Sequence, residues 1–487
     1  MVLVYLGLFL LCLILRLPSF AVPFLSDDEA AYAAMARILQ AGGKIYRDAV
    51  DHKPPMTVWL YSGVFQLFGA YNMIAIHLLL VVWVYATAWV LGAVAEHYAG
   101  RRARWWAMLF YLLFSTTLRD YDALAANNEL LMNLPIVLGV YACIKNRAFW
   151  SGLLIGFAMT IKYQAIFPGA ALFSYLMLRR DWKHAGWLLT GGLCAGALLI
   201  GVLLAQGVWP DFLYWGIGFN THYIGQGLGA REAALRLLRR SLEGILPALL
   251  VWLLAIWSVV REGSYKGLLG FWLLASLAAM FLGGRFFGHY FLQPLAPLAV
   301  LAGLEMPRLW ELTTRSRVLR ILLLIGLVIP GGIFFTLAVR REQLLRIVNE
   351  REPDYASVGR RVQELTRPTD TIFVWTNSPQ IYYYAHRTPG TRFTFCNYQT
   401  GQSPATPAEE DPAVDTTPYM VLPAWEMLMA DLETNRPKMF VDATHAHFDD
   451  FGKSPLEKFP RLAQWVWDHY DLVDQVKGVR LFQLKAW

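Results

Sequence analysis

The sequence predicts a polytopic α-helical membrane protein with a small α/β domain at its C-terminal end. Of its 487 residues, 56% are hydrophobic and only 16% are charged. Apolar runs long enough to cross a bilayer recur over residues 1–340. From residue 341 onward, short strand-like runs alternate with helix-like ones, which is typical of an α/β layer domain. We therefore expect a transmembrane module at 1–340 and an extracytoplasmic domain at 341–487.

The transmembrane module is expected to contain about eleven helices, because roughly 20 apolar residues span the hydrocarbon core and fewer suffice where a helix is shielded. The first apolar range lacks the basic start and the cleavage site of a signal peptide, so we interpret it as an uncleaved helix. The predicted helices are 2–22, 71–97, 104–118, 127–144, 149–162, 164–178, 185–206, 244–260, 267–284, 288–304 and 318–340.

Basic residues between the apolar runs give the orientation. With the N-terminus inside, every proposed inner loop is basic, as the positive-inside rule requires. These residues are Arg101, Arg102, Arg104, Lys145, Arg147, Arg179, Arg180, Lys183, Arg261, Lys266, Arg308, Arg315 and Arg317. The first loop, at 23–70, and the C-terminal domain then lie outside. The formal net charge of +7 is spread over these clusters, which argues against nucleic-acid binding.

The first external loop opens with three consecutive acids, Asp27, Asp28 and Glu29. Ser26 can cap a helix that begins here, and acids in a first turn complement the helix dipole. That structural role accounts for one or two of the acids. Carboxylates beside a bilayer are costly, so the cluster predicts a functional site, with an ionised carboxylate as a general base. The predicted helix continues through Tyr32.

Lys53 precedes two prolines later in the same loop. Proline is tolerated in a first helical turn, so the pair is expected to stop one segment and start a helix. A helix N-terminus favours anions, and a lysine there suits a phosphate. A lysine reaching from the surface toward water is the alternative interpretation.

Further polar residues interrupt the apolar runs at their outer ends. Lys162 is a lone lysine at the end of an apolar run, where isolated charges tend to mark ligand contacts unless they reach the interface. A glycine-rich turn carries Arg285, whose guanidinium suits phosphate oxygens, followed by His289 and Tyr290. Acids also recur at Asp120, Asp122 and Glu129. They are candidates to orient an acceptor or the base, or simply helix-start carboxylates.

One basic external segment departs from the orientation rule. Residues 230–240 alternate leucines and arginines, which predicts an amphipathic helix on the outer surface. It is either a lipid-headgroup anchor or an element that contacts phosphate. His445, His447, Asp449 and Asp450 have loose spacing for a metal site. The four cysteines form no framework.

In the C-terminal domain, strands are expected at 371–375, 392–395 and 438–442, with a closing hairpin at 472–476 and 479–485. A strand-like run also begins at 470. Helices are expected near 353–366, 378–386, 418–434 and 457–469.

Together these features resemble the membrane glycosyltransferases of the protein-mannosyltransferase and lipid A aminoarabinose-transferase type, within the glycosyltransferase C superfamily. The resemblance rests on Asp28-Glu29-Ala30-Ala31-Tyr32, Lys53-Pro54-Pro55, the segment 156–162, the segment from Gly284-Arg285 to Pro294, and Val374-Trp375 with the residues after it. It covers nearly the whole chain, and the start of its outer domain is similar to that of bacterial members.

The resemblance implies transfer of a sugar from a polyprenyl-phosphate donor to a lipid, glycan or protein acceptor, with inversion, at the outer face of a bacterial inner membrane. It maps the catalytic acid onto Asp28, with Glu29 beside it and Asp27 as a rival by one position. By position, Lys53, Lys162 and Arg285 would bind the donor phosphate. The scheme needs no cofactor, and a divalent metal is not excluded.

A transporter or flippase for lipid-linked sugars is the alternative function. It would share the many helices and the charges at membrane depth. Transporters typically show paired half-sequences with broken helices at matching positions, and the sequence shows no such symmetry. The outer domain also has little use in a transporter, so the sequence favours the enzyme.

Overall fold

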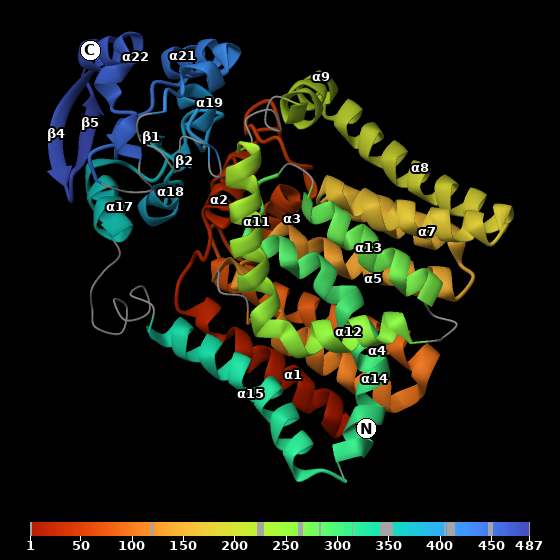
Figure 1. Ribbon diagram of the computed structural model, residues 1–487. Helices are drawn as coiled ribbons and strands as arrows, with labels where there is room; N and C mark the ends of the chain where they lie inside the picture. The colour runs from red at the N-terminus through yellow and green to blue at the C-terminus, as the bar shows by residue number, and fades with distance from the viewer. Residues whose placement is uncertain are drawn as a thin grey trace. The chain divides into compact units, whose positions relative to one another are not determined.

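The computed structural model describes residues 2–117, 121–221, 228–261, 266–281, 284–313, 315–340, 354–403, 406, 414–446 and 451–486 (Figure 1). The chain divides into two compact units. The first comprises Met1–Leu25, Ile74–Val202 and Arg231–Leu344, and the second comprises Ser26–Met73, Leu203–Ala230 and Leu345–Trp487.

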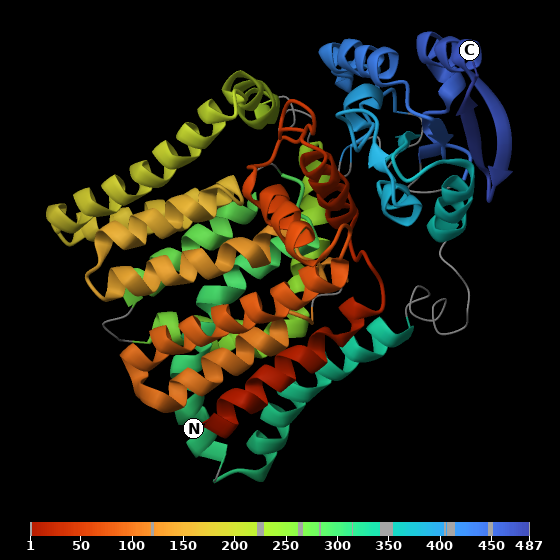
Figure 2. The same cartoon turned by 180° about the vertical axis from the view of Figure 1, so that it is seen from behind.

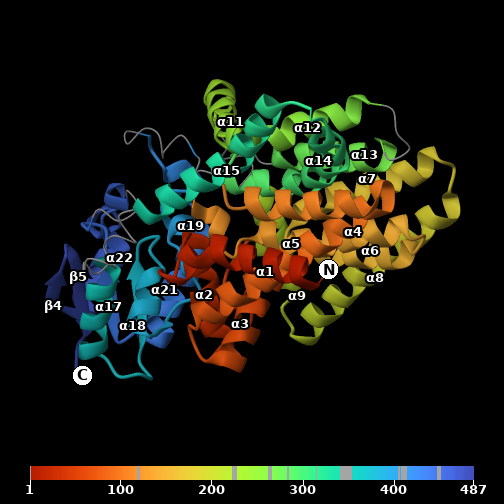
Figure 3. The same ribbon diagram turned by 90° about the horizontal axis from the view of Figure 1, so that it is seen from below.

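The first unit is a bundle of helices. Each predicted apolar range holds helix, and the closest packing joins α5 to α6, α12 to α14 and α13 to α7. The helices α12, α13 and α14 run next to one another in Figures 1 and 3. The elements are α1 (Val2–Arg16), α4 (Met73–Phe114), α5 (Asn128–Ile144), α6 (Ala148–Met159), α7 (Ile166–Leu178), α8 (Trp182–Ala205), α11 (Ala230–Ile245), α12 (Leu249–Val260), α13 (Lys266–Phe281), α14 (Leu292–Thr313) and α15 (Arg317–Arg340).

The element α4 is a helical hairpin, as the two predicted ranges 71–97 and 104–118 require. Gly100 breaks the helix with φ 78° and ψ −176°, a conformation that glycine adopts without strain. The two arms pack closely, because a Cβ at Gly92 would lie 2.8 Å from the side chain of Met108. Figure 2 shows the arms running antiparallel.

The outer helices of this unit expose large apolar side chains. Leu198 on α8 is 67% exposed and Val328 on α15 is 66% exposed. Apolar surface of this kind suits lipid, and helices satisfy their own backbone groups there. By length and apolarity, four stretches of the described chain could cross a membrane: Val2–Phe20, Met73–Phe114, Trp182–Ala205 and Ala230–Val260. The other apolar helices found are shorter: Met56–Phe68, Asn128–Ile144, Ala148–Met159, Tyr163–Leu178 and Gly267–Phe281.

The second unit contains a five-stranded mixed sheet of order β2-β1-β3-β5-β4. The strands are β1 (Thr371–Trp375), β2 (Thr388–Pro389), β3 (Met439–Asp442), β4 (Tyr470–Val476) and β5 (Val479–Leu484). Strand β1 is parallel to β2 and β3, whereas β5 is antiparallel to β3 and β4. The predicted closing hairpin is confirmed, with Lys477 and Gly478 both at positive φ in its turn.

Helices flank this sheet close to their predicted positions. They are α17 (Asp354–Leu365), α18 (Gln380–Ala385), the short α19 (Asn397–Thr400), α21 (Leu422–Asn435) and α22 (Pro460–His469). The predicted strand at 392–395 is wrong. The backbone N–H of Arg392 donates to Asp431 and its carbonyl accepts from Val50, so neither group is available to a sheet, and Thr388–Pro389 forms the strand instead.

The second unit also includes the predicted first external loop, with α2 (Asp27–Gln40) and α3 (Met56–Phe68), and the segment with α9 (Trp209–Phe212). Aromatic rings join these segments to the α/β fold. The ring of Tyr398 lies 5.3 Å from that of Trp215 and 5.0 Å from that of Phe219. From the segment Ser26–Met73, which carries the predicted acids, the ring of Tyr71 packs against that of Tyr383 at 5.4 Å. That segment therefore folds as one unit with the α/β domain.

Candidate active site

The first turn of α2 holds the three predicted acids. Ser26 is extended, with φ −146° and ψ 156°, and its hydroxyl accepts a hydrogen bond from the backbone N–H of Glu29 at 3.4 Å. This confirms Ser26 as the predicted N-cap. Asp27, Asp28 and Glu29 follow it directly in the first turn of α2, where the positive end of the helix dipole stabilises negative charge.

Asp28 lies beside Lys53 and Tyr32. The Nζ atom of Lys53 is 2.7 Å from Oδ1 of Asp28 and donates a hydrogen bond to the hydroxyl of Tyr32 at 2.9 Å. It also lies 5.0 Å from the centre of the Tyr32 ring, a cation–π distance. We call Asp28, Tyr32 and Lys53 the acid–lysine cluster. The structure thus brings together a carboxylate, a cation and a phenol that the sequence selected separately.

Charge in this cluster is fixed by its surroundings. Burial opposes the positive charge of Lys53, but the carboxylate of Asp28, with Tyr32 and Asp51, outweighs it and holds the pKa of Lys53 well above its ordinary value. Burial and then the charge of Asp28 raise the pKa of Tyr32 well above its ordinary value. Lys53 is therefore a permanent cation, and Tyr32 stays a neutral phenol.

A tight loop presents Lys53 to the cluster. Oδ1 of Asp51 accepts hydrogen bonds from the backbone N–H groups of His52, at 2.7 Å, and Lys53, at 3.3 Å. The hydroxyl of Tyr46 donates to the carbonyl of Lys53 at 2.9 Å. Asp51 is 8% exposed, and its burial raises its pKa. Sequence reasoning missed Asp51 as a site residue, although an aspartate two positions before Lys53 is the signal for such an Asx turn.

The prolines after Lys53 lead into a helix, as the sequence predicted. Pro55 is the N-cap of α3, and the helix starts at Met56. The prolines therefore lie before the first turn and not within it. Because proline lacks a backbone N–H, it leaves no unsatisfied donor at this junction.

The other two acids of the first turn have different surroundings. The side chain of Glu29 is fully buried, and Tyr61 lies close enough for the charge of Glu29 to help raise that phenol's pKa after the larger effect of burial. Asp27 is exposed, and its Oδ1 accepts a hydrogen bond of 2.6 Å from Nε2 of Gln380 on α18. Gln380 carries no signal in the sequence that would have identified it.

A second set of predicted residues gathers in the first unit. Glu129 lies in the first turn of α5, after the cap Asn127, and is 2% exposed. Its carboxylate forms an ion pair with Lys162 and lies 3.7 Å from Nε2 of His289. The Nζ atom of Lys162 lies 4.4 Å from the centre of the Tyr290 ring. We call Glu129, Lys162, His289 and Tyr290 the Glu129 cluster.

Residues of this cluster lie at the breaks between helices. The predicted helix 149–162 ends at Met159, and Lys162 is extended, with φ −152° and ψ 131°, before the turn that leads into α7. Lys162 thus lies in the turn between α6 and α7, where its backbone N–H still donates to the carbonyl of Ala158 at 3.0 Å and its own carbonyl accepts from Ala165 at 3.1 Å. Gly284 adopts φ 64° in the glycine-rich turn, and the adjacent Arg285 is 1% exposed. The turn therefore places a buried guanidinium near the start of α14.

Removing one partner of the buried Glu129–Lys162 pair should destabilise the protein. Lys162→Ala leaves a buried carboxylate with less compensation, which costs about 3 kcal/mol or more when a buried ion pair is broken. We expect a clear fall in the unfolding temperature of the purified protein. The double variant Glu129→Gln with Lys162→Met removes both charges and should recover most of the loss. Equal stability of wild type and Lys162→Ala would contradict this pairing.

Some of the predicted site residues lie wholly or partly outside the described part of the chain. Asp120 lies outside the described residues, and of Asp122 only the backbone position, in the turn Tyr121–Leu124, is described. His447, Asp449 and Asp450 also lie outside the described part of the chain. Over the remaining described residues, no group of three or more His, Cys, Asp or Glu side chains is arranged to hold a metal ion.

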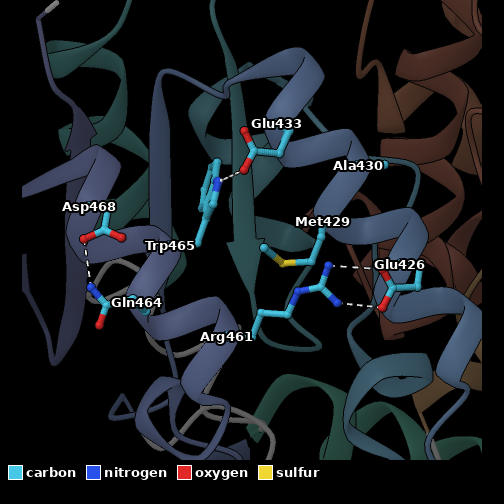
Figure 4. Close-up of a pocket in the computed structure, with 8 residues that line it drawn as sticks. All are labelled: Glu426, Met429, Ala430, Glu433, Arg461, Gln464, Trp465 and Asp468. Atoms are coloured by element: carbon cyan, nitrogen blue, oxygen red, sulfur yellow. Dashed lines mark hydrogen bonds and ion pairs between the residues drawn. The ribbon is translucent and has the colours of Figure 1, made fainter.

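A groove of about 440 Å³ lies on the α/β domain between α21 and α22 (Figure 4). Its carboxylates all have partners in that figure. Glu426 pairs with Arg461 at 2.6 Å, Glu433 accepts from the indole N–H of Trp465 at 2.6 Å, and Asp468 accepts from an amide. None of the predicted site residues lines it. The groove therefore belongs to the structure of the domain and not to the candidate site.

Comparison with known proteins agrees with this arrangement. Residues 52–209 match the model of the dolichyl-phosphate-mannose-protein mannosyltransferase family. ArnT from Cupriavidus metallidurans, solved bound to undecaprenyl phosphate, is similar with a TM-score of 0.66 at 14% identity, over 99% of this chain and 97% of that one. The chain has a glycosyltransferase C fold. The resemblance found in the sequence is confirmed at the level of the fold.

Two further structures share the glycosyltransferase C fold. The apo form of the same ArnT has a TM-score of 0.59 at 14% identity, over 93% of this chain and 92% of that one. The apo oligosaccharyltransferase of Archaeoglobus fulgidus has a TM-score of 0.51 at 11% identity, over all of this chain and 74% of that one. No curated protein matches the sequence.

The matched family region and the site overlap in part. The region 52–209 contains Lys53, Asp122, Glu129 and Lys162, whereas the acids of α2 and the turn with Arg285 lie outside it. The comparisons support the predicted class, a membrane glycosyltransferase. The roles of individual residues depend on the geometry described above.

Proposed function

We propose that this chain transfers a sugar from a polyprenyl-phosphate donor to a hydroxyl group of a lipid, glycan or protein acceptor. The observation that carries the proposal is the acid–lysine cluster. It holds a carboxylate, which can accept a proton, 2.7 Å from a permanent cation, which can bind a phosphate. The family match over 52–209 and the fold support the same reaction class.

The proposed reaction is a single displacement with inversion. The acceptor oxygen attacks the anomeric carbon from the face opposite the phosphate, and Asp28 takes the hydroxyl proton. The bond from the anomeric carbon to the phosphate oxygen breaks, and its electron pair leaves with polyprenyl phosphate. Negative charge grows on the phosphate as the bond breaks, so a fixed cation lowers the barrier.

Lys53 links donor binding to the activity of the base. Without donor it is paired with Asp28, so the ammonium group occupies the carboxylate that an acceptor hydroxyl would approach. A donor phosphate competes for the ammonium group, since it also is an anion. When Lys53 turns toward the phosphate, the carboxylate of Asp28 is released to accept the proton of the acceptor hydroxyl. The base thus becomes accessible when the donor is in place.

The remaining residues keep the roles that the sequence predicted. In the proposal, Glu29 and Tyr32 support the base, while Lys162, Arg285, His289 and Tyr290 are donor-phosphate residues. Asp122 and Glu129 act toward the acceptor, and the ion pair with Lys162 supports a second role for Glu129 in orienting that lysine. Lysine and arginine supply the positive charge, so the scheme requires no cofactor, and a divalent metal is not excluded.

The location belongs to the proposal as well. The exposed apolar side chains of α8 and α15 support a membrane protein. The basic inner loops then place the acid–lysine cluster and the α/β domain on the external side, which in a bacterium is the periplasmic side of the inner membrane. A lipid-linked donor reaches such a site from within the bilayer.

The test is turnover by purified protein in lipid nanodiscs. A panel of radiolabelled polyprenyl-phosphate sugars is supplied with lipid, glycan and peptide acceptors, and both labelled product and released polyprenyl phosphate are measured. We expect one donor to yield both in equal amounts. Movement of an intact donor across a vesicle membrane, with no bond cleavage from any donor, would support the transporter alternative and overturn the proposal.

A further inference from the structure

One segment of the α/β domain holds both ends of the helix that carries the acids. At the start of α2, Nε2 of Gln380 donates to Oδ1 of Asp27 at 2.6 Å. Near its end, the guanidinium of Arg37 lies 5.6 Å from the centre of the Tyr71 ring. The hydroxyl of Tyr71 in turn donates to the carbonyl of Arg387 at 3.0 Å.

The contacts at the second end are built from buried aromatic groups. Tyr71 is 4% exposed, and its ring packs edge-on against Tyr383 at 5.4 Å and against His386 at 6.1 Å. Edge-to-face pairs at such distances add to the energy of burial. Residues 380–387 therefore contact the N-terminal end of α2 directly, through a single amide, and its C-terminal end indirectly, through Tyr71.

That amide is well placed to act as a support. Gln380 is 7% exposed, and within the described part of the chain its Oε1 makes no hydrogen bond. The bond from its Nε2 to Asp27 is charge-assisted, which makes it about twice as strong as a neutral one. The two residues lie 353 positions apart, so only the folded unit creates this contact.

We propose that Gln380 is a positioning residue, through which the α/β domain fixes the first turn of α2 and keeps Asp27 engaged so that Asp28 serves as the base. This inference rests on the proposed function, since it assigns a task to the domain within the same reaction. Asp27 and Asp28 differ in what holds them. An incoming phosphate attracts the positively charged ammonium of Lys53 away from Asp28. It attracts the neutral amide of Gln380 far less, so the bond from Gln380 to Asp27 is kept.

Two variants at this position separate positioning from folding. Gln380→Ala removes the side chain, and Gln380→Glu keeps its shape but replaces the N–H donor with a second carboxylate against Asp27. We expect both to lower kcat by roughly tenfold or more, as misplaced catalytic groups do, with the donor KM within about twofold of wild type, because Lys53 is untouched. Gln399→Ala is the matched control: Gln399 is buried and donates within the same domain, to the carbonyl of Ala424 at 3.2 Å.

A double-mutant cycle tests whether Gln380 acts through Asp27. If Gln380 acts through Asp27, Asp27→Ala and Gln380→Ala each cause the same loss, and the double variant loses no more than either one. Additive losses would overturn the inference, because they would mean that Gln380 acts elsewhere.

Hydrogen–deuterium exchange of the peptide 27–35 supplies a readout that needs no activity. Gln380→Ala and Gln380→Glu should speed exchange there, whereas Gln399→Ala should not. Unchanged exchange together with wild-type kcat overturns the positioning role while the transferase function stands. If Gln380→Ala speeds exchange but the wild-type protein turns over no donor, the contact between Gln380 and α2 is retained and the proposed function is overturned.

Discussion

Replacing Asp28 by asparagine is expected to lower transfer by about a thousandfold, within the range that a general base contributes. Asparagine keeps the size of the side chain but cannot take the proton of the acceptor hydroxyl. It also leaves Lys53 without its 2.7 Å partner, so donor binding should be retained or strengthened. The measurement is kcat and donor KM for purified Asp28→Asn in nanodiscs, with labelled donor.

The neighbouring aspartate is the matched control. Asp27→Asn removes the same charge one position earlier, and the asparagine oxygen still accepts the hydrogen bond from Gln380. We expect this variant to keep most of the wild-type kcat. Loss of turnover in Asp27→Asn with activity retained in Asp28→Asn would move the base by one position. Full activity in both variants would remove the first turn of α2 from the mechanism.

Lys53→Ala is expected to reduce kcat/KM by roughly 10²–10³-fold, the cost of losing one group that stabilises developing charge. The lysine contacts both Asp28 and Tyr32 and has the raised pKa of a permanent cation. Its removal should raise donor KM and lower kcat together, because the phosphate is bound in the ground state and gains charge as the bond breaks. Steady-state kinetics over a range of donor concentrations distinguishes the two effects.

Lys44 in the same loop provides the control for this variant. It is exposed, and its Nζ donates to the carbonyl of Gln206 at 2.8 Å and not to a member of the acid–lysine cluster. Lys44→Ala should therefore leave the kinetics within about twofold of wild type, as surface substitutions usually do. Unchanged turnover of Lys53→Ala at low donor concentration would show that Lys53 does not bind the phosphate.

Local sequence patterns predicted the elements well where hydrophobicity or a cap decides them. The apolar ranges became helices, Ser26 became the N-cap of α2, and Gly100 separates the two arms of α4. These features depend on neighbouring residues, because helix caps and apolar runs act over a few positions. The predicted strand at 392–395 was wrong because the backbone N–H of Arg392 bonds the side chain of Asp431, a contact beyond its own neighbourhood.

The candidate site was predictable by residue type and only partly by arrangement. The sequence selected Asp28, Tyr32 and Lys53 separately, and the structure shows that they touch. It also selected Glu129 and Lys162 for different roles, acceptor and donor, whereas the structure pairs them. Asp51 and Gln380 were missed, because neither the Asx turn beneath Lys53 nor the amide on Asp27 leaves a periodic pattern.

The sequence alone indicated the class of this protein, through apolar runs of bilayer length, the basic residues between them, and the acids and the lysine of the predicted external loop. Those properties depend on composition and on neighbouring residues, because membrane insertion and helix capping respond to stretches of adjacent residues. Only the tertiary structure decided which groups meet, as with Asp27 and Gln380, which are 353 positions apart. Such contacts follow from how helices and strands pack, and packing depends on the shapes of whole elements brought together from distant parts of the chain.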